Sequence, residues 1–359
     1  MIVENASVKL AGYSLALGVP LLTPLGMAAD MPWLAPLIVF GIFPILGLVI
    51  GEDRSLPVLG LRRSAWRVAY LEWLPRIYAV VWIATLLWSA GYVANADVDA
   101  GTIAWLIVSV GIGSAVAICT AHELMHRYSW GDVTLGRVMS AFCFYGHMYV
   151  EHLHHHATVG DIAAGETAPR GRSVFWFAPT DFMHGLRNAW TVETKRLRRS
   201  GEPWWHNRML QDYGLAAGIA LAFGILSWEA LVLFVGQALF AVYCFEVITY
   251  VHHYGLVRRE GEEPGPQHAW AHHCWITNCL TFNNTFHSDH HLRPRVPYYE
   301  LHAMYGAPRL PASYFTMFIV ALVPPLWRRL MDRRLDALAA AASREPADLP
   351  DELRGQVCR

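Results

Sequence analysis

The sequence predicts an all-α integral membrane protein with about six transmembrane helices. Of its 359 residues, 54% are hydrophobic and 16% are charged, and the mean hydropathy is +0.27. This composition is typical of membrane proteins and unusual for a soluble domain. In addition, six apolar runs approach the length that an α-helix needs to cross a bilayer. They cover residues 10–29, 33–50, 77–93, 102–120, 213–228 and 230–251.

The first two runs contain prolines, at Pro20, Pro24, Pro36 and Pro44. Proline is costly inside a soluble helix, but a membrane helix tolerates it because neighbouring helices can satisfy the freed backbone groups. The first run could also be a signal peptide, but it lacks a basic start followed by a small-residue cleavage site, and a second apolar run follows almost at once. We therefore expect both runs to remain in the protein as membrane helices.

The third run follows a loop that is rich in arginine. Arg54, Arg62, Arg63, Arg67 and Arg76 lie between the second and third runs, whereas the links on the opposite side of the membrane contain no lysine or arginine. Lysine and arginine are enriched in cytoplasmic loops. We therefore expect a multi-pass protein of the inner membrane with both termini in the cytoplasm.

Four histidine clusters follow apolar segments. The fourth run continues into His-Glu-Leu-Met-His at residues 122–126, and a moderately apolar segment at residues 131–150 leads to His-Leu-His-His-His. The sixth run ends at His253, and the last cluster is His-Ser-Asp-His-His at residues 287–291. The arginine pattern places all four clusters on the cytoplasmic side, although it is independent of the histidines. This agreement favours one shared, histidine-rich cytoplasmic cap.

Within the clusters, the spacing of the histidines is that of a metal site. Positions three or four residues apart lie on one face of a helix, and a neutral imidazole is a good ligand for first-row metals. One octahedral ion cannot accept nine nitrogens, whereas two ions with open positions can share them, so we expect a site for two metal ions. The nine candidate ligands are His122, His126, His152, His155, His156, His253, His287, His290 and His291.

Two other interpretations of the histidines remain open. The 122–126 segment matches the zinc-protease motif His-Glu-x-x-His, but three further clusters exceed what a single zinc site uses. An isolated histidine near a membrane surface more often hydrogen-bonds to headgroups or backbone than binds a metal. We expect this ordinary hydrogen-bonding role for the histidines that lie outside the spacing of the four clusters, which are His147, His184, His206 and His302.

Six side chains beside the candidate ligands are expected to support them. A carboxylate can accept the second ring N–H of a ligand histidine and fix its tautomer. A histidine near the site can do the same or serve as a reserve ligand. The set comprises Glu123, Glu151, Asp289, His268, His272 and His273.

Composition also excludes several classes of function. The net charge is −1 and the arginines are scattered, so no nucleic-acid partner is expected. The six cysteines form no Cys-x-x-Cys pair, and they are expected to be reduced, buried thiols. Because the chain has no flavin fingerprint and no haem attachment motif, electrons for a redox reaction must come from a separate protein.

The chain resembles the integral-membrane di-iron hydroxylases of the alkane monooxygenase and xylene monooxygenase family, within the fatty-acid desaturase superfamily. The resemblance rests on Ala-His-Glu-Leu-Met-His-Arg at 121–127, Tyr-Val-His-His-Tyr-Gly-Leu-Val-Arg at 250–258, His-Ala-Trp at 268–270 and His-Ser-Asp-His-His at 287–291. The segments 297–301 and 323–327 are more similar to the xylene enzymes. Three features depart from the alkane enzymes. They are the His-x-x-His-His spacing of the second cluster, His252, where those enzymes usually have glutamate, and Asn283–Phe286, which replaces their usual lead into the last cluster.

The resemblance implies a membrane monooxygenase that inserts one oxygen of O2 into a terminal or benzylic C–H bond of an apolar hydrocarbon. It implies the same nine histidines as ligands of two non-haem iron ions. It also implies electrons from NAD(P)H through a rubredoxin or ferredoxin-type protein and its reductase, for which the arginine-rich cytoplasmic surface is a plausible dock.

An apolar substrate would dissolve in the membrane lipid and reach the site among the helices. Large side chains near the cytoplasmic helix ends are candidates for its walls, although packing in the helix core is the more common role for any one of them. The candidate wall residues are Trp82, Trp88, Tyr145, Phe245 and Glu246.

Two alternative functions remain at this stage. The His-x-x-His-His spacing suits a lipid desaturase or lipid hydroxylase of the same superfamily. A membrane metal transporter or sensor would need ionisable groups inside the spans, and Glu246 is the main one there. We expect one membrane-embedded domain at residues 1–334 and a polar C-terminal tail at residues 335–359.

Overall fold

In a computed structural model of the protein, residues 6–53 and 64–342 are described. The ordered elements within these ranges are helices, and paired extended backbone is limited to two isolated bridges, Glu52–Cys274 and Ala271–Arg309. The predicted all-α class is therefore confirmed.

Five helices are long and apolar enough to cross a membrane, and they correspond to five of the six predicted runs. They are Ser7–Ala28, which comprises α1 (Ala6–Gly12), η1 (Tyr13–Leu17) and α2 (Gly18–Ala28), then α5 (Ala65–Asn95), α6 (Ala100–Met125), α10 (Arg208–Leu226) and α11 (Trp228–His253). Helix α5 begins well before residue 77. The predicted run started later because Arg67, Glu72 and Arg76 in the first turns of the helix interrupt the apolar sequence.

The remaining predicted run is also helical but shorter. It forms α3 (Leu34–Pro36), the wider η2 (Leu37–Ile42) and α4 (Phe43–Ile50). Together they make a helix from Leu34 to Ile50, and at 1.5 Å per residue its length is roughly 25 Å, less than the hydrocarbon thickness of a typical bilayer. The count of six spans therefore stays a prediction, as does the cytoplasmic orientation.

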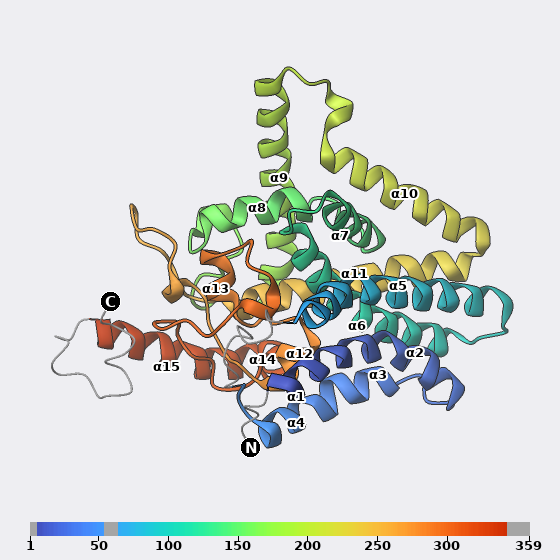
Figure 1. Ribbon diagram of the computed structural model, residues 1–359, viewed down its shortest axis with the longest axis horizontal. Helices are drawn as coiled ribbons and strands as arrows, with labels where there is room; N and C mark the ends of the chain where they lie inside the picture. Colours follow the sequence, from blue (N-terminus) through green and yellow to red (C-terminus); the bar gives the residue numbers. More distant parts are fainter. Residues whose placement is uncertain (1–5, 54–63, 343–359) are drawn as a thin grey trace.

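Helices α5, α6 and α11 form the centre of the membrane bundle and run in similar directions in Figure 1. A chain of buried hydrogen bonds links them. The Trp82 indole donates to Ser114 Oγ at 2.9 Å, the Ser114 hydroxyl donates to Gln237 Oε1 at 2.5 Å, and the Gln237 amide donates to the Phe142 carbonyl at 3.0 Å. Polar side chains that bond across helices fix their relative positions in an apolar environment.

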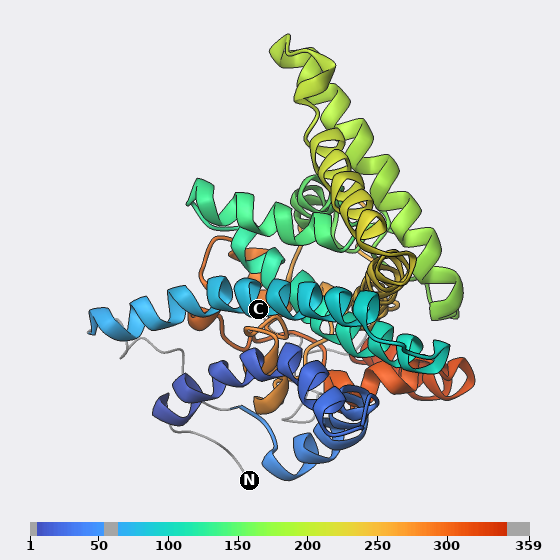
Figure 2. The same ribbon diagram turned by 90° about the vertical axis from the view of Figure 1, so that its right-hand side faces the viewer.

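Shorter elements form a cap at one end of the bundle, where α8 and α13 lie in Figure 1. The cap and its connections comprise α7 (Trp130–Phe142), α8 (Met148–Thr158), η4 (Ile162–Ala164), η6 (Pro266–His268), α12 (Trp275–Leu280), α13 (His287–Leu292), η7 (Tyr298–Glu300) and α14 (Tyr314–Ala321). The remaining helix pair, α9 (Val174–Ser200) and α10, is joined through η5 (Trp204–His206) and projects as an arm in both views (Figures 1 and 2).

The last helix, α15 (Pro324–Ala342), crosses the predicted boundary at residue 334 without a break. Beyond that boundary, Asp336 pairs with Arg170 at 2.5 Å, and the Leu335 side chain lies over Gly255. The rest of the predicted tail, residues 343–359, lies outside the described residues. The division into a domain and a tail stays a prediction.

Candidate metal centre

The four histidine clusters are carried by four different helices that meet in the cap. His122 lies in the last turn of α6 and His126 caps it, while His253 is the last residue of α11. The second cluster lies on α8 and the fourth on α13. Segments that are far apart in the sequence therefore bring all nine predicted ligands together.

The nine imidazoles form two adjoining groups in which each residue offers one nitrogen, and the nitrogens of a group lie within 4.8 Å of one another. The first group contains His122, His126, His152, His156 and His290, and the second contains His155, His253, His287 and His291.

The distances between ring nitrogens fit shared metal ions. Within the first group, His156 Nε2 lies 3.0 Å from His152 Nε2 and 3.2 Å from His126 Nε2. Within the second, His287 Nε2 lies 2.7 Å from His291 Nε2 and 3.2 Å from His253 Nε2. Two nitrogens bound at right angles to one first-row metal at about 2.1 Å lie about 3 Å apart.

Two further observations support this fit. The Nε2 atoms of His122 and His290 are buried and have no hydrogen-bond partner among the described residues, which is expected of atoms that bind a metal. Burial lowers the pKa of His155 and of His156 to about 3, and burial lowers the pKa of His290 well below its ordinary value. The rings are therefore neutral at physiological pH, which is the form that binds metals.

The second ring nitrogens of two ligands in the four-histidine group are fixed by hydrogen bonds. His155 Nδ1 lies 2.6 Å from Glu166 Oε2, and His253 Nδ1 lies 2.9 Å from the His268 carbonyl oxygen. Both contacts leave Nε2 directed at the other histidines, as an orienting partner should. The partner that supports His155, Glu166, was missed by the sequence analysis because it lies in a loop with no motif around it.

The predicted supporting residues lie in several places. Glu123 pairs with Arg127 at 3.2 Å, and Asp289 accepts both bonds of the Arg293 guanidinium and the His302 backbone N–H, so neither carboxylate is paired with a candidate ligand. Glu151 lines the cavity beside the histidines. The remaining three members of the set are the histidines of residues 268–273.

Of those three histidines, one touches the candidate ligands. His268 holds His253 through its carbonyl oxygen, while its own Nδ1 accepts the Gly265 backbone N–H at 3.0 Å. His273 stacks on Phe286 with 4.5 Å between ring centroids, and neither it nor His272 belongs to the two groups.

Beside the two groups lies a cavity with an empty volume of about 480 Å³, which we name the histidine chamber. Its wall carries five of the candidate ligands and four carboxyl side chains, of which Glu151, Asp181 and Glu246 are buried and Glu166 is partly buried. Burial raises the pKa of Glu166 to about 8 and that of Asp181 to about 6. Glu246 accepts a hydrogen bond from the Tyr145 hydroxyl at 2.8 Å.

Asp181 was also missed by the sequence analysis, although a signal for it exists. It occupies a buried position on α9 in the stripe of Phe177, Ala178 and Gly185. An acidic residue in the buried stripe of an amphipathic helix usually has a specific polar partner. Here the partner is the backbone N–H of Glu166, whose nitrogen lies 2.5 Å from the Asp181 carboxylate.

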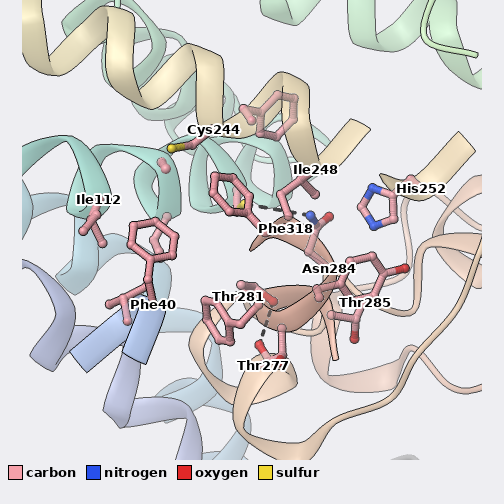
Figure 3. Close-up of a pocket in the computed structure, with 17 residues that line it drawn as sticks. Phe40, Ile112, Cys244, Ile248, His252, Thr277, Thr281, Asn284, Thr285 and Phe318 are labelled. Carbon is pink, nitrogen blue, oxygen red and sulfur yellow. Dashed lines mark hydrogen bonds between the residues drawn. The ribbon is translucent and has the colours of Figure 1, made fainter. Parts of the chain in front are cut away.

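A second cavity adjoins the histidine chamber and has an empty volume of about 700 Å³ (Figure 3). We name it the apolar cavity. Its walls come from η2, α6, α11, α12 and α14 and from the segment before α13. The lining residues are Val39, Phe40, Ile112, Ala115, Val116, Cys119, Cys244, Phe245, Ile248, His252, Thr277, Thr281, Asn284, Thr285, Tyr314, Phe315 and Phe318.

Two threonines on the wall of the apolar cavity have their hydroxyl groups engaged by the protein. Thr281 donates to the Thr277 carbonyl at 2.8 Å (Figure 3), and the Thr285 hydroxyl donates to Asn278 Oδ1. The third threonine of the wall, Thr277, has a buried hydroxyl without a partner among the described residues. The wall is therefore mostly apolar, with polar groups at Thr277, His252 and Asn284.

The five predicted wall residues divide between these cavities and the helix core. Tyr145, Phe245 and Glu246 line the histidine chamber, and Phe245 also lines the apolar cavity. Trp82 is fully buried in the hydrogen-bonded core, and Trp88 is 41% exposed and stacks on Tyr92. Neither tryptophan lines the two cavities.

Comparison with known proteins places this architecture in a family. Residues 100–321 match the fatty acid desaturase family. The chain is 34% identical over 322 residues to alkane 1-monooxygenase 2 of Alcanivorax borkumensis, covering 85% of this chain and 83% of that protein. It is 35% identical over 314 residues to alkane 1-monooxygenase 1 of Pseudomonas aeruginosa, covering 84% and 82%.

A more distant relative is the xylene/toluene monooxygenase hydroxylase component XylM of Pseudomonas putida. It is 29% identical over 215 residues, which cover 59% of this chain and 58% of that protein. The resemblance to both groups of enzymes noted in the sequence is thereby confirmed. The chain belongs to the fatty acid desaturase family, in the group that contains the alkane and xylene monooxygenases.

Proposed function

We propose that this protein is a membrane di-iron monooxygenase that inserts one oxygen of O2 into a terminal or benzylic C–H bond of an apolar hydrocarbon. One observation carries the proposal: two groups of neutral histidines lie beside the histidine chamber, and this chamber shares four side chains with a cavity whose wall is mostly apolar. The named activities of the relatives, alkane 1-monooxygenase and xylene/toluene monooxygenase, support hydroxylation over desaturation.

The donor set favours iron over zinc for this role. All nine predicted ligands are imidazoles, which suit both metals, but zinc has no accessible redox chemistry. Two bound iron ions would supply the O2 activation and electron transfer that the protein side chains cannot provide. The five-histidine group would hold one ion and the four-histidine group the other.

The side chains of the protein perform the remaining tasks. Glu166 and the His268 carbonyl orient His155 and His253. The apolar cavity excludes water and binds the hydrocarbon chain along Ile112, Cys244 and Phe318. The four side chains shared by the two cavities would limit which carbon of that chain approaches the histidine side.

The remaining components of the reaction lie outside the chain. The substrate would enter from the membrane lipid, and electrons would come from NAD(P)H through a rubredoxin or ferredoxin-type donor. We place the histidine side and both termini in the cytoplasm, because that orientation gives a soluble donor access to the cap.

Isotope labelling tests this function directly. Membranes containing the protein would receive NADH, donor proteins, ¹⁸O2 and either a medium-chain alkane or a methyl-aromatic compound. We expect one ¹⁸O atom in a terminal or benzylic alcohol. A product with a new double bond and no ¹⁸O would assign the protein to the desaturases instead, and no product from either substrate class would reject the proposal.

A further inference from the structure

Four side chains line both the histidine chamber and the apolar cavity, and they therefore lie at the boundary between them, which we name the passage. They are Phe245, Ile248, His252 and Asn284. The first two are apolar, as the route of a hydrocarbon requires. The other two are polar, and neither is explained by metal binding or by the packing of the helices.

His252 is buried but incompletely satisfied. It is 3% exposed, and its Nε2 atom has no hydrogen-bond partner among the described residues. Its ring lies parallel to that of His287, with 4.0 Å between centroids and 10° between planes. Adjacent positions on a helix point about 100° apart, so His252 faces the passage while His253 joins the metal groups.

The side chain of Asn284 is half-buried and weakly bonded. The hydrogen bond found for its side chain within the described parts of the chain is a long contact from Nδ2 to Cys119 Sγ, at 3.8 Å. The neighbouring Asn283 lies away from the apolar cavity, and its amide donates to Tyr13 and to the Tyr298 carbonyl at 2.7 and 2.8 Å. Figure 3 shows Asn284 and His252 on the same side of the apolar cavity.

A buried polar group without a partner costs free energy, and such groups in a native protein call for an explanation. A hydrocarbon cannot satisfy either side chain. A hydroxyl group can, because it both donates and accepts, and it can therefore pair with either tautomer of His252 and either end of the Asn284 amide.

We propose that His252 and Asn284 form a binding site for the hydroxyl group of an alcohol whose hydrocarbon chain occupies the apolar cavity. This inference rests on the proposed function, which forms such an alcohol at the boundary of the histidine chamber. The ligand class is an uncharged primary or benzylic alcohol, because neither lysine nor arginine lines the passage or the apolar cavity. The pair retains the product after the reaction instead of contacting the substrate before it.

Equilibrium binding without turnover tests this assignment. The full-length protein, loaded with iron and placed in nanodiscs, would receive radiolabelled decane or 1-decanol in the absence of electron donors. Protein-free nanodiscs correct for partition into lipid. One or two net hydrogen bonds correspond to roughly threefold to tenfold tighter binding of the alcohol than of the alkane.

The variants His252→Phe and Asn284→Leu preserve shape but remove the polar groups. We expect each to abolish most of the alcohol preference while leaving decane binding and iron content unchanged. His252→Gln restores a hydrogen-bonding group and should recover part of the preference. Thr281→Val, on the same wall but with its hydroxyl already paired, is the matched control and should keep the full preference.

Two results would overturn the site. Either the alcohol preference survives in both variants, or the alkane and alcohol affinities fall in parallel, which would indicate packing alone. These results are distinguishable from failure of the proposed function. A protein that makes ¹⁸O-labelled alcohol but shows no polar preference lacks the hydroxyl site, whereas a protein that makes no labelled alcohol fails at the earlier step.

Discussion

The histidine chamber and the apolar cavity share four side chains, yet their walls differ in chemistry and in sequence origin. The chamber is lined by imidazoles and carboxyl groups that come mainly from short clusters. The cavity is lined by Val39, Ile112, Phe318 and other apolar side chains scattered over helices from both ends of the chain. In the proposed function, this arrangement would bring one end of a hydrocarbon close to the metal site while the rest of its chain lies between apolar walls.

We expect the largest effect from removing a candidate metal ligand beside the histidine chamber. His152→Ala removes one ligand of the five-histidine group, and we expect the iron content to fall towards one ion per chain. Hydroxylation should fall by more than about 100-fold, because even residues that merely orient a ligand are typically worth 10–100-fold.

The matched control for His152→Ala lies on the same helix. His154 on α8 belongs to neither histidine group, so His154→Ala should retain both ions and most of the activity. Equal loss of iron in the two variants would show that α8 is sensitive to any substitution and would remove support for the assigned ligands.

The apolar cavity can be altered without changing any of the candidate metal ligands. Ala115 on α6 lines the apolar cavity, and Ala115→Trp should fill part of the space that the hydrocarbon needs. We expect hydroxylation to fall by roughly 100-fold, since misplacement of a substrate by about 1 Å can have an effect of this size.

Iron analysis separates this effect from loss of the metal centre. The iron content of Ala115→Trp should stay at two ions per chain, and Ala115→Val should lose much less activity. If the tryptophan variant processed a long alkane as fast as the unsubstituted protein, the apolar cavity would not be the substrate site.

A smaller effect is expected at the contact between Glu166 and His155, which are 2.6 Å apart. Glu166→Gln keeps the size of the side chain but weakens the acceptor for the ring N–H. Above about pH 8, where Glu166 is ionised, iron affinity of the four-histidine group should fall by about 10–100-fold, measured by competition with a chelator. Glu202→Gln, at an exposed position on the arm, should leave the affinity unchanged, and an equal loss there would contradict the orienting role.

The smallest effect concerns stability and its dependence on pH. Burial raises the pKa of Asp181 from 3.8 to about 6, so the folded state opposes ionisation of this carboxyl group. The resulting penalty is absent below about pH 4, grows as the pH rises and is complete above about pH 6. Asp181→Asn removes it and should stabilise the protein by roughly 1–3 kcal/mol at pH 8 but not at pH 4.

Thermal unfolding at the two pH values checks this prediction. A gain for Asp181→Asn that is equal at pH 4 and pH 8 would show that the substitution acts through packing or hydrogen bonding rather than through charge.

The sequence predicted the chamber much better than the cavity, for a physical reason. Histidines at helical spacing have few alternative explanations when four clusters follow apolar segments, so His122, His155 and His287 were identifiable in advance. Val39 and Phe318 have no such signal, because an apolar residue in a membrane helix is equally suited to packing, to lipid contact and to a cavity wall.

The errors in detail have a similar origin. Trp82 was expected on the substrate wall, but its indole N–H finds Ser114 in the helix core. Glu166 carries no motif and is brought to His155 by the loop that follows α8. Neighbours in sequence also proved to be poor guides to function, since Asp289 bonds to Arg293 rather than to the histidines on either side of it.

The central claim is that the two histidine groups hold two redox-active iron ions. Quantitative metal analysis of the purified protein, combined with Mössbauer spectroscopy of ⁵⁷Fe-enriched samples, tests it most directly. The account predicts two iron ions per chain with nitrogen-rich coordination, and loss of one of them in the His152→Ala variant. A single zinc ion per chain, or iron content that is unaffected by loss of any of the nine histidines, would contradict it.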